Sequence, residues 1–514
     1  MKEHKSRDKL TLVVGILVVI LAAIALMIAT AFYYRSRNGK GQEEETTKAV
    51  VKIPDITNAP DETEKTSRAA ENSVQDTQAS AETRSSAQKA EKESDTPDAE
   101  ATAAETETAG TEEMDAASEE TTAGTALKGS VSAAEYIEEV NAATLANPQS
   151  HRADIANLTE ISAQEVLERI NSYQVPGRSY LDGAARKEGD FAYTMSRRNL
   201  EAVKDPVTLY YGVLITNTAV RSFPTWQKLS DGTGADDADY LQETMLMTGE
   251  GVVVLHQTED EIWSFVQADS YCGWIETQNI AFCSRSEMVS YIQSKKFMVV
   301  TEPVATVDGI ALRMGTRLPL VDTADGSLVV QMPKSDENGK LTIREAGVDP
   351  AKVSEGYLTL SKEAIVKQAR KLLGTNYGWG DSNGYMDCSS TLRAVYGCFG
   401  IILPRNTAWL TGSGLKITDL SQMSRAEKEV FIQEMPEGGI LLINGHAMID
   451  IGQEDGVESM LHTVTQYKLT ADGELERPMK CVITPVSICN SAGTSYLDLY
   501  TTAITIDWSR ISEE

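Results

Sequence analysis

The sequence predicts an α+β protein, on three observations. From residue 361 a helix-first pattern is followed by strands to the C-terminus, which is the order of an α+β domain. Two earlier stretches, 206–290 and 291–360, consist of short strands separated by Gly, Asp and Ser turns, which we interpret as two small β-barrels. Residues 131–205 show apolar residues at helical spacing, with a capping box at Ser162 and Glu165, and form a predicted helical segment.

The N-terminus predicts a membrane anchor. Residues 10–31 form 22 consecutive positions without charge, and a helix of that length spans roughly 30 Å, the thickness of the hydrocarbon core. We therefore expect a cytoplasmic tail at 1–9, a transmembrane helix at 10–34 and an extracytoplasmic remainder on the cell-wall side. A cleaved signal peptide stays open as the alternative, because Ala29-Thr30-Ala31 is typical of a cleavage site.

Residues 35–130 form a predicted disordered acidic linker. Within residues 41–130 there are 22 Asp or Glu against 8 Lys or Arg and no aromatic residue, so little apolar surface is available to offset chain entropy. The whole chain has 514 residues and a net charge of −29. This acidity argues against nucleic-acid binding, which needs clustered Lys and Arg.

A candidate nucleophile lies at the start of a predicted helix. The segment 376–390 reads NYGWGDSNGYMDCSS, and a helix after it is indicated by four apolar residues on one face, Leu392, Val395, Tyr396 and Phe399. Asp387 is the predicted N-cap, which puts Cys388 in the first turn, where unpaired amides and the helix dipole favour an anion. Such a position lowers a thiol pKa. A buried, inert structural cysteine stays open on this segment alone.

Two of the five histidines fall in one predicted hairpin. His446 lies in an alternating strand, and His462 lies in the strand that follows the turn at Asp455-Gly456. A three-residue loop, 454–456, places both rings on one face, whereas a regular two-residue loop places them on opposite faces. We expect both rings on one face, through a loop of odd length or a compensating bulge. A base and an orienting group on one face, opposite a helix-terminal cysteine, form a triad arrangement.

The last 150 or so residues resemble the NlpC/P60 cell-wall endopeptidases, which have a papain-like fold. The resemblance rests on a set of motifs in the family's order: Tyr377-Gly378-Trp379-Gly380, Asp387-Cys388-Ser389, Leu403-Pro404-Arg405-Asn406-Thr407, Gly445-His446 and His462. Residues 221–282 resemble the bacterial SH3 domain that accompanies this unit in some members, and a second SH3-like unit with Met314-Gly315-Thr316 also fits. Leu410, Gly438-Gly439 and Asp450 depart from the family pattern.

The resemblance implies a cysteine peptidase that hydrolyses the γ-D-glutamyl bond to the diamino acid in peptidoglycan stem peptides. Cys388 is then the nucleophile, His446 the base and His462 its orienting partner. No metal or cofactor is expected, since no HExxH or comparable ligand cluster appears. Two alternatives stay open: a thiol amidase of the N-acetylmuramoyl-L-alanine type, and a non-catalytic wall-binding protein.

The resemblance also implies a cleft that one SH3 barrel closes at one end, so that short peptides with a free N-terminal L-alanine are preferred. The expected contacts are Tyr271 and an acidic residue near Asp239 on the barrel, with Trp379 across the cleft. Asp387 and Ser389, which flank the cysteine, complete the expected substrate-binding set. The six cysteines include two close pairs, 272/283 and 481/489, and the sequence leaves open whether they form disulfides.

Overall fold

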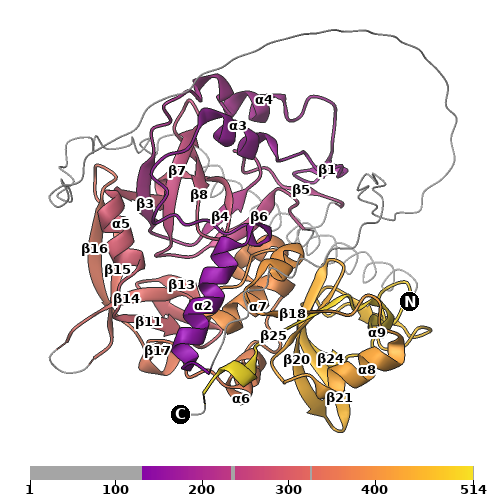
Figure 1. Ribbon diagram of the computed structural model, residues 1–514. Coiled ribbons are helices and arrows are strands. Elements are labelled where there is room, and N and C mark those ends of the chain that lie inside the picture. The colour runs from indigo at the N-terminus through magenta and orange to yellow at the C-terminus, as the bar shows by residue number, and fades with distance from the viewer. Residues whose placement is uncertain (1–129, 233–237, 324–326, 513–514) are drawn as a thin grey trace, which may run out of the picture. The chain divides into compact units, whose positions relative to one another are not determined.

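The computed structural model describes residues 130–232, 238–323 and 327–512 (Figure 1). The predicted tail at 1–9, the predicted membrane helix at 10–34 and all but the last residue of the predicted acidic linker lie outside these residues. In the part of the chain that is described, no helix has both the length and the apolar character needed to cross a membrane.

The N-terminal segment is helical, as predicted, and contacts two other units. It contains α2 (Ala133–Ala146), α3 (Ala163–Asn171) and α4 (Ala192–Arg197), and Ser162 and Glu165 form the predicted capping box of α3. It also contains two short strands that the sequence did not suggest, β1 (Tyr180–Leu181) and β2 (Ala184–Ala185), which join β5 (Leu229–Ser230) in a small sheet.

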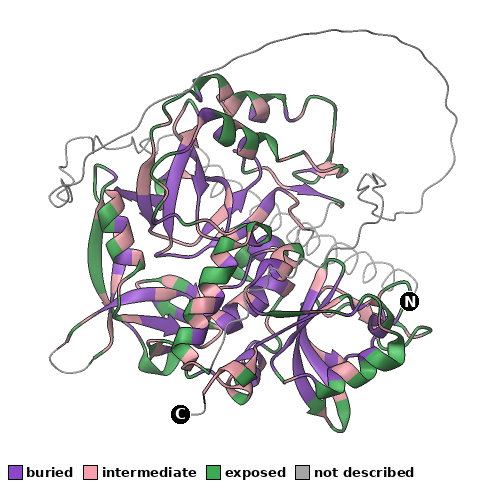
Figure 2. Ribbon diagram, in the orientation of Figure 1, coloured by how far each residue is buried: buried purple, intermediate pink, exposed green. Residues whose placement is uncertain are grey.

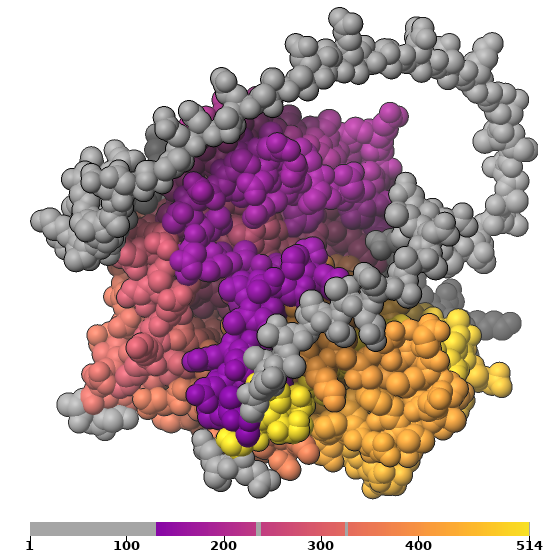
Figure 3. All heavy atoms as spheres, viewed as in Figure 1, coloured from indigo at the N-terminus to yellow at the C-terminus, as the bar shows by residue number. Residues whose placement is uncertain are grey.

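Helix α2 packs on the C-terminal unit, whereas α3 packs on the first barrel. Tyr136 and Val140 of α2 belong to the core of the C-terminal unit, and Val166 and Ile170 of α3 belong to the core of the barrel. The Asp507 amide donates to the Tyr136 hydroxyl at 2.9 Å. The space-filling view shows α2, in purple, beside the yellow C-terminal residues (Figure 3).

The first predicted barrel is a seven-stranded antiparallel sheet with the order β10-β3-β7-β8-β9-β4-β6. Its strands alternate with tight turns, as the sequence predicted: β3 (Tyr210–Leu214), β4 (Thr218–Arg221), β6 (Gln242–Leu246), β7 (Gly251–Gln257), β8 (Trp263–Gln267), β9 (Cys272–Glu276) and β10 (Ile280–Cys283). Helix α5 (Arg285–Ile292) follows. Strand β6 faces the C-terminal unit and supplies barrel residues to the candidate site.

The second short-strand stretch forms a separate antiparallel sheet with the order β16-β15-β14-β11-β17 and a hairpin, β12-β13. The strands are β11 (Phe297–Val300), β12 (Val304–Val307), β13 (Ile310–Arg313), β14 (Arg317–Val321), β15 (Val329–Ser335), β16 (Leu341–Gly347) and β17 (Val353–Glu355). Gly315 approaches the helix α7 (Cys388–Gly397) so closely that an added Cβ would lie 3.0 Å from the Ala394 carbonyl oxygen.

The C-terminal unit places two helices against a six-stranded sheet with the order β18-β25-β19-β20-β21-β24. The helices α6 (Lys362–Arg370) and α7 (Cys388–Gly397) come first, as predicted. The strands are β18 (Lys416–Asp419), β19 (Ile440–Ile443), β20 (His446–Glu454), β21 (Val457–Val464), β24 (Lys480–Pro485) and β25 (Thr502–Thr505). Two further helices interrupt the predicted run of strands, α8 (Arg425–Glu434) and α9 (Tyr496–Leu499).

The core of this unit lies between α7 and the sheet, where the ribbon is coloured as buried (Figure 2). Leu392, Val395 and Phe399, three residues of the predicted apolar face, are fully buried there. They pack with Ala447 and Ile449 of β20. This packing fixes the start of α7 against the start of β20, which is where the cysteine and the first histidine lie.

Candidate active site

Cys388 is the first residue of α7, where the sequence placed it. Asp387 is the N-cap, and its carboxylate accepts a hydrogen bond from the Ser390 amide at 2.9 Å, while the Ser390 hydroxyl accepts from the Asp387 amide. The Cys388 Sγ lies 3.6 Å from the Thr407 Oγ1 and accepts a hydrogen bond from the backbone amide of Ala447. The thiol is half-buried between the helix start, the Thr407 loop and β20.

The surroundings of Cys388 raise the pKa of its thiol, whereas the sequence predicted a lowered pKa. Burial raises the pKa of Cys388, and the adjacent Asp387 carboxylate raises it further. The Thr407 hydroxyl, the Ala447 amide and the Arg405 guanidinium oppose this rise without cancelling it. The thiol is therefore protonated at neutral pH and needs a base to become a nucleophile.

The two histidines lie on one face of the sheet, as predicted, but the hairpin achieves this differently. The loop has two residues, Asp455 and Gly456, both with positive φ, and Glu454 pairs with Val457. A β-bulge at Ile451-Gly452 shifts the register between the 450/460 pair and the 453/458 pair. The loop therefore has two residues, and the compensating bulge, which the prediction allowed, keeps both rings on one face.

The histidines form a hydrogen-bonded chain that ends on a threonine. The His446 Nε2 lies 2.8 Å from the His462 Nδ1, and the His462 Nε2 lies 3.1 Å from the Thr484 Oγ1. If Thr484 accepts, then His462 carries its proton on Nε2, its Nδ1 accepts, and His446 donates from Nε2. This arrangement leaves the His446 Nδ1 as the basic nitrogen.

Burial keeps this pair neutral. It lowers the pKa of His446 to about 4, and the Asp387 charge opposes that change. The pKa of the fully buried His462 falls further, through burial and the neighbouring His446. A neutral His446 is the form that can accept the proton of Cys388.

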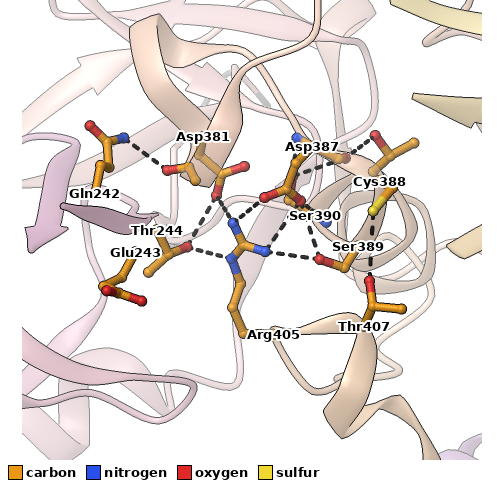
Figure 4. A network of polar contacts seen from close by, with 12 residues as sticks. Gln242, Glu243, Thr244, Asp381, Asp387, Cys388, Ser389, Ser390, Arg405 and Thr407 are labelled. Carbon is orange, nitrogen blue, oxygen red and sulfur yellow. Dashed lines mark hydrogen bonds and ion pairs between the residues drawn. The ribbon is translucent and has the colours of Figure 1, made fainter. Parts of the chain in front are cut away.

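A buried ion network lies beside the cysteine (Figure 4). The Arg405 guanidinium binds both oxygens of Asp387, at 2.7 and 3.2 Å, and lies 3.2 Å from an oxygen of Asp381. Arg313 binds Asp381 from the other side at 3.2 Å. Arg405 also donates to Thr244 of β6. No sequence pattern predicted this network, although Arg405 belongs to the Leu403-Pro404-Arg405 motif.

The expected substrate residues Asp387 and Ser389 have engaged side chains. Asp387 uses both carboxylate oxygens for Arg405, and one of them also accepts the Ser389 hydroxyl at 3.2 Å. The Ser389 hydroxyl accepts a further hydrogen bond from Arg405 at 2.9 Å. Both side chains are therefore hydrogen-bonded to Arg405 at the helix start, and their expected contact with substrate stays a prediction.

The expected end wall contains Tyr271, but its acidic partner is Glu243. The Tyr271 hydroxyl donates to the Glu243 carboxylate at 2.7 Å. Asp239 instead binds Arg221 at 2.9 Å with one oxygen, and the other oxygen accepts the Leu229 and Leu241 amides. Asp239 is thus bound within the barrel, and the acidic side chain that contacts Tyr271 is Glu243, four residues further on. The expected contact of Asp239 with substrate stays a prediction.

Two adjacent residues connect this wall to the cysteine. The side chain of Asn406 hydrogen-bonds Tyr271, and the next residue, Thr407, contacts Cys388. The ring of Trp409 packs against Tyr271 with ring centres 5.4 Å apart. Trp379 is 40% exposed, and its ring centre is 5.0 Å from that of Tyr240 on the barrel side. Sequence reasoning singled out Tyr271 and Trp379 but missed Glu243 and Trp409.

All six cysteines are free, so neither close pair forms a disulfide. Among residues 130–232, 238–323 and 327–512 there is no group of three His, Cys, Asp or Glu side chains that could hold a metal ion. Cys398, the second cysteine of the α7 segment, is fully buried, and burial raises its pKa to about 12. Cys388 therefore differs from it in being only half-buried and in lying at the helix start, where its sulfur accepts a hydrogen bond from the amide of Ala447.

Known proteins match both parts of this arrangement. Residues 374–482 match the NlpC/P60 family, and residues 227–276 match the SH3 domain of the SH3b1 type. A gamma-D-glutamyl-L-lysine dipeptidyl-peptidase from Bacillus cereus is 21% identical over 237 residues, which are 43% of this chain and 67% of the relative.

Solved structures resemble the chain in fold. An NlpC/P60 endopeptidase from Photobacterium damselae subsp. piscicida has a TM-score of 0.58 and 18% identity, over 72% of this chain and 92% of that one. An NlpC/P60 family protein from Bacillus cereus has a TM-score of 0.39 and 17% identity, over 58% and 98%. Residues 374–482 are therefore an NlpC/P60 domain, which is a cysteine-peptidase domain, and residues 227–276 are a bacterial SH3 domain.

Proposed function

We propose that this chain hydrolyses the γ-D-glutamyl–diamino acid bond of peptidoglycan stem peptides. The observation that carries the proposal is the place of Cys388 at the start of α7, where it accepts a hydrogen bond from the backbone amide of Ala447. Ala447 directly follows His446, which begins the His446–His462–Thr484 chain. The Bacillus cereus relative is a gamma-D-glutamyl-L-lysine dipeptidyl-peptidase, which supports the same substrate class.

The mechanism follows from the neutral thiol and the neutral base. His446 accepts the Cys388 proton as the sulfur attacks the carbonyl carbon, and the backbone amide at the helix start stabilises the oxyanion. The resulting imidazolium donates its proton to the leaving amine, which leaves a thioester on Cys388. His446 then activates water to hydrolyse the thioester, and His462 holds the ring in the same orientation throughout.

Substrate choice is the second part of the proposal. Glu243 and Tyr271 form a polar end wall. Asn406 hydrogen-bonds Tyr271, and the next residue, Thr407, contacts Cys388, so the wall and the cysteine are joined by two consecutive residues. A carboxylate paired with a phenol binds a free ammonium by charge-assisted hydrogen bonds. We infer that the N-terminal L-alanine of a free stem peptide binds there, and that a peptide still attached to glycan is excluded.

The anchoring part of the proposal rests on the sequence alone. The uncharged run at 10–34 would hold the chain in the membrane, and the acidic linker would let the NlpC/P60 domain reach peptide on the cell-wall side. Carbonate extraction of membranes should leave the chain in the pellet. Release of a shorter, soluble chain would support the signal-peptide alternative instead.

Product analysis tests the substrate assignment. We expect the purified full chain to split a free L-Ala-γ-D-Glu-diamino acid tripeptide into a dipeptide and the diamino acid, as seen by mass spectrometry. Release of intact stem peptide from glycan would support the amidase alternative. Binding to the wall without any cleavage product would support the non-catalytic alternative.

A further inference from the structure

One arginine beside the cysteine has more polar partners than its place in a short loop motif suggests. Arg405 is 2% exposed, and its guanidinium contacts four side chains, Asp387, Asp381, Ser389 and Thr244 (Figure 4). Burying a charge in this way is costly unless every donor is satisfied. Because so many donors of the Arg405 guanidinium are hydrogen-bonded, the network holds this side chain in one position.

The four partners come from three separate parts of the chain. Asp387 and Ser389 belong to the start of α7, Asp381 belongs to the turn 379–384, and Thr244 belongs to β6 of the SH3 barrel. Gln242, also on β6, donates to the Gly380 carbonyl at 2.8 Å in the same turn. Arg405 therefore joins the helix that carries the nucleophile to the barrel that carries the end wall.

We propose that Arg405 is a positioning residue for the nucleophile: it neutralises the Asp387 carboxylate that caps the Cys388 helix, and it fixes that cap to the SH3 barrel through Thr244. This inference rests on the proposed role of Cys388. It assigns a role to Arg405, which the proposed peptidase mechanism does not use. Its physical basis is that an aspartate next to a nucleophilic thiol caps the helix well but repels the thiolate.

The charges around Cys388 support this role. The titratable groups that interact with the thiol are Asp387 on its own element, Arg405 on the loop before Thr407, Tyr377 and Tyr496. The neutral His446 lies one residue before Ala447, whose amide donates a hydrogen bond to the thiol. Burial raises the pKa of Tyr496 to about 12 and that of Tyr377 further, so both phenols stay neutral. Asp387 and Arg405 then carry the charges, with opposite effects on the thiol pKa.

The plain alternative is that Arg405 only stabilises the fold. Arg313 provides a matched comparison, because it binds the same buried Asp381 at 3.2 Å, with a side chain that is 11% exposed. Arg313 makes no contact with Asp387 among the described residues, so its loss removes an ion pair without exposing Cys388 to an unpaired carboxylate. A purely structural network predicts similar behaviour for the two arginines.

The test is the pH dependence of Cys388 alkylation by iodoacetamide, followed by peptide mass spectrometry on the full chain. We expect Arg405→Gln to move the midpoint upward by about one pH unit, in the range for loss of a nearby opposite charge. Arg313→Gln should leave the midpoint in place. The double variant Asp387→Asn/Arg405→Gln should bring it back toward wild type, because Asn still caps the helix and the repelling charge is gone.

Equal midpoints in wild type and Arg405→Gln, or equal shifts in the two arginine variants, would overturn the proposal. If Arg405→Gln fails to fold, Thr244→Val decides, because it removes one partner of Arg405 and keeps the guanidinium. The proposal then requires a smaller upward shift of the midpoint, and an unchanged midpoint overturns it. Alkylation needs no substrate, so failure to cleave stem peptides would refute the proposed function and leave this readout intact.

Discussion

Replacing Glu243 by Gln removes the negative charge of the end wall while keeping the shape of the side chain. The wild-type carboxylate accepts the Tyr271 hydroxyl at 2.7 Å and remains half-buried, and burial raises its pKa. An ammonium bound there gains a hydrogen bond to a charged group, which contributes roughly 1.5–3 kcal/mol. At about 1.4 kcal/mol per factor of ten, the variant should lose roughly ten- to a hundredfold in kcat/KM on a free tripeptide.

The assay compares a free stem tripeptide with its N-acetylated form. Wild type should strongly prefer the free peptide, while Glu243→Gln should cleave both at similar low rates. Asp239→Asn is the matched control, because it removes a carboxylate charge from the same barrel at a position bound to Arg221. It should lower stability and keep the preference. Equal wild-type rates on free, acetylated and glycan-linked peptides would refute the closed-cleft reasoning.

Three further predictions concern the hairpin. Thr484→Val removes the acceptor of the buried His462 and should lower kcat about tenfold or more with little change in KM; unchanged kcat would show that the threonine does not hold the tautomer. Gly452→Ala places a side chain at φ +72° in the bulge and should cost about 1–2 kcal/mol of unfolding free energy, measured by urea denaturation; an unchanged midpoint would argue against the bulge. Burial lowers the pKa of His446 to about 4, below its unfolded value of about 6.5, so the folded protein should lose stability as the pH drops from about 6.5 to about 4. For the same reason, kcat/KM should fall on the acid side with a midpoint near pH 4. A midpoint near pH 6.5, about the ordinary value, would contradict the neutral base.

Local patterns predicted the parts of the site that depend on short stretches of chain. The apolar face after Asp387 fixed the start of the helix, and with it the position of Cys388. Strand alternation predicted His446 and His462 on one face, through either an odd loop or a bulge. A bulge and a longer loop give the same register, so a sequence pattern alone does not distinguish them.

Features that depend on distant segments were not predictable in this way. Asp239 and Glu243 are both acidic and four residues apart, and only the fold shows that the first is bound to Arg221 and the second to Tyr271. The Arg405 network joins residues more than 100 positions apart in the chain, so no local spacing reveals it. The thiol pKa follows burial, which overrides the helix-terminus argument made from the sequence.

The covalent intermediate tests the central claim most directly. The full chain is mixed with free L-Ala-γ-D-Glu-diamino acid tripeptide, quenched in acid within the first turnovers and mapped by peptide mass spectrometry. We predict a thioester carrying the L-alanyl-γ-D-glutamyl group on Cys388, absent from Cys388→Ala and retained in Cys398→Ala, whose cysteine is buried further along the chain. Full hydrolysis by Cys388→Ala, or an adduct on any other residue, would contradict the account.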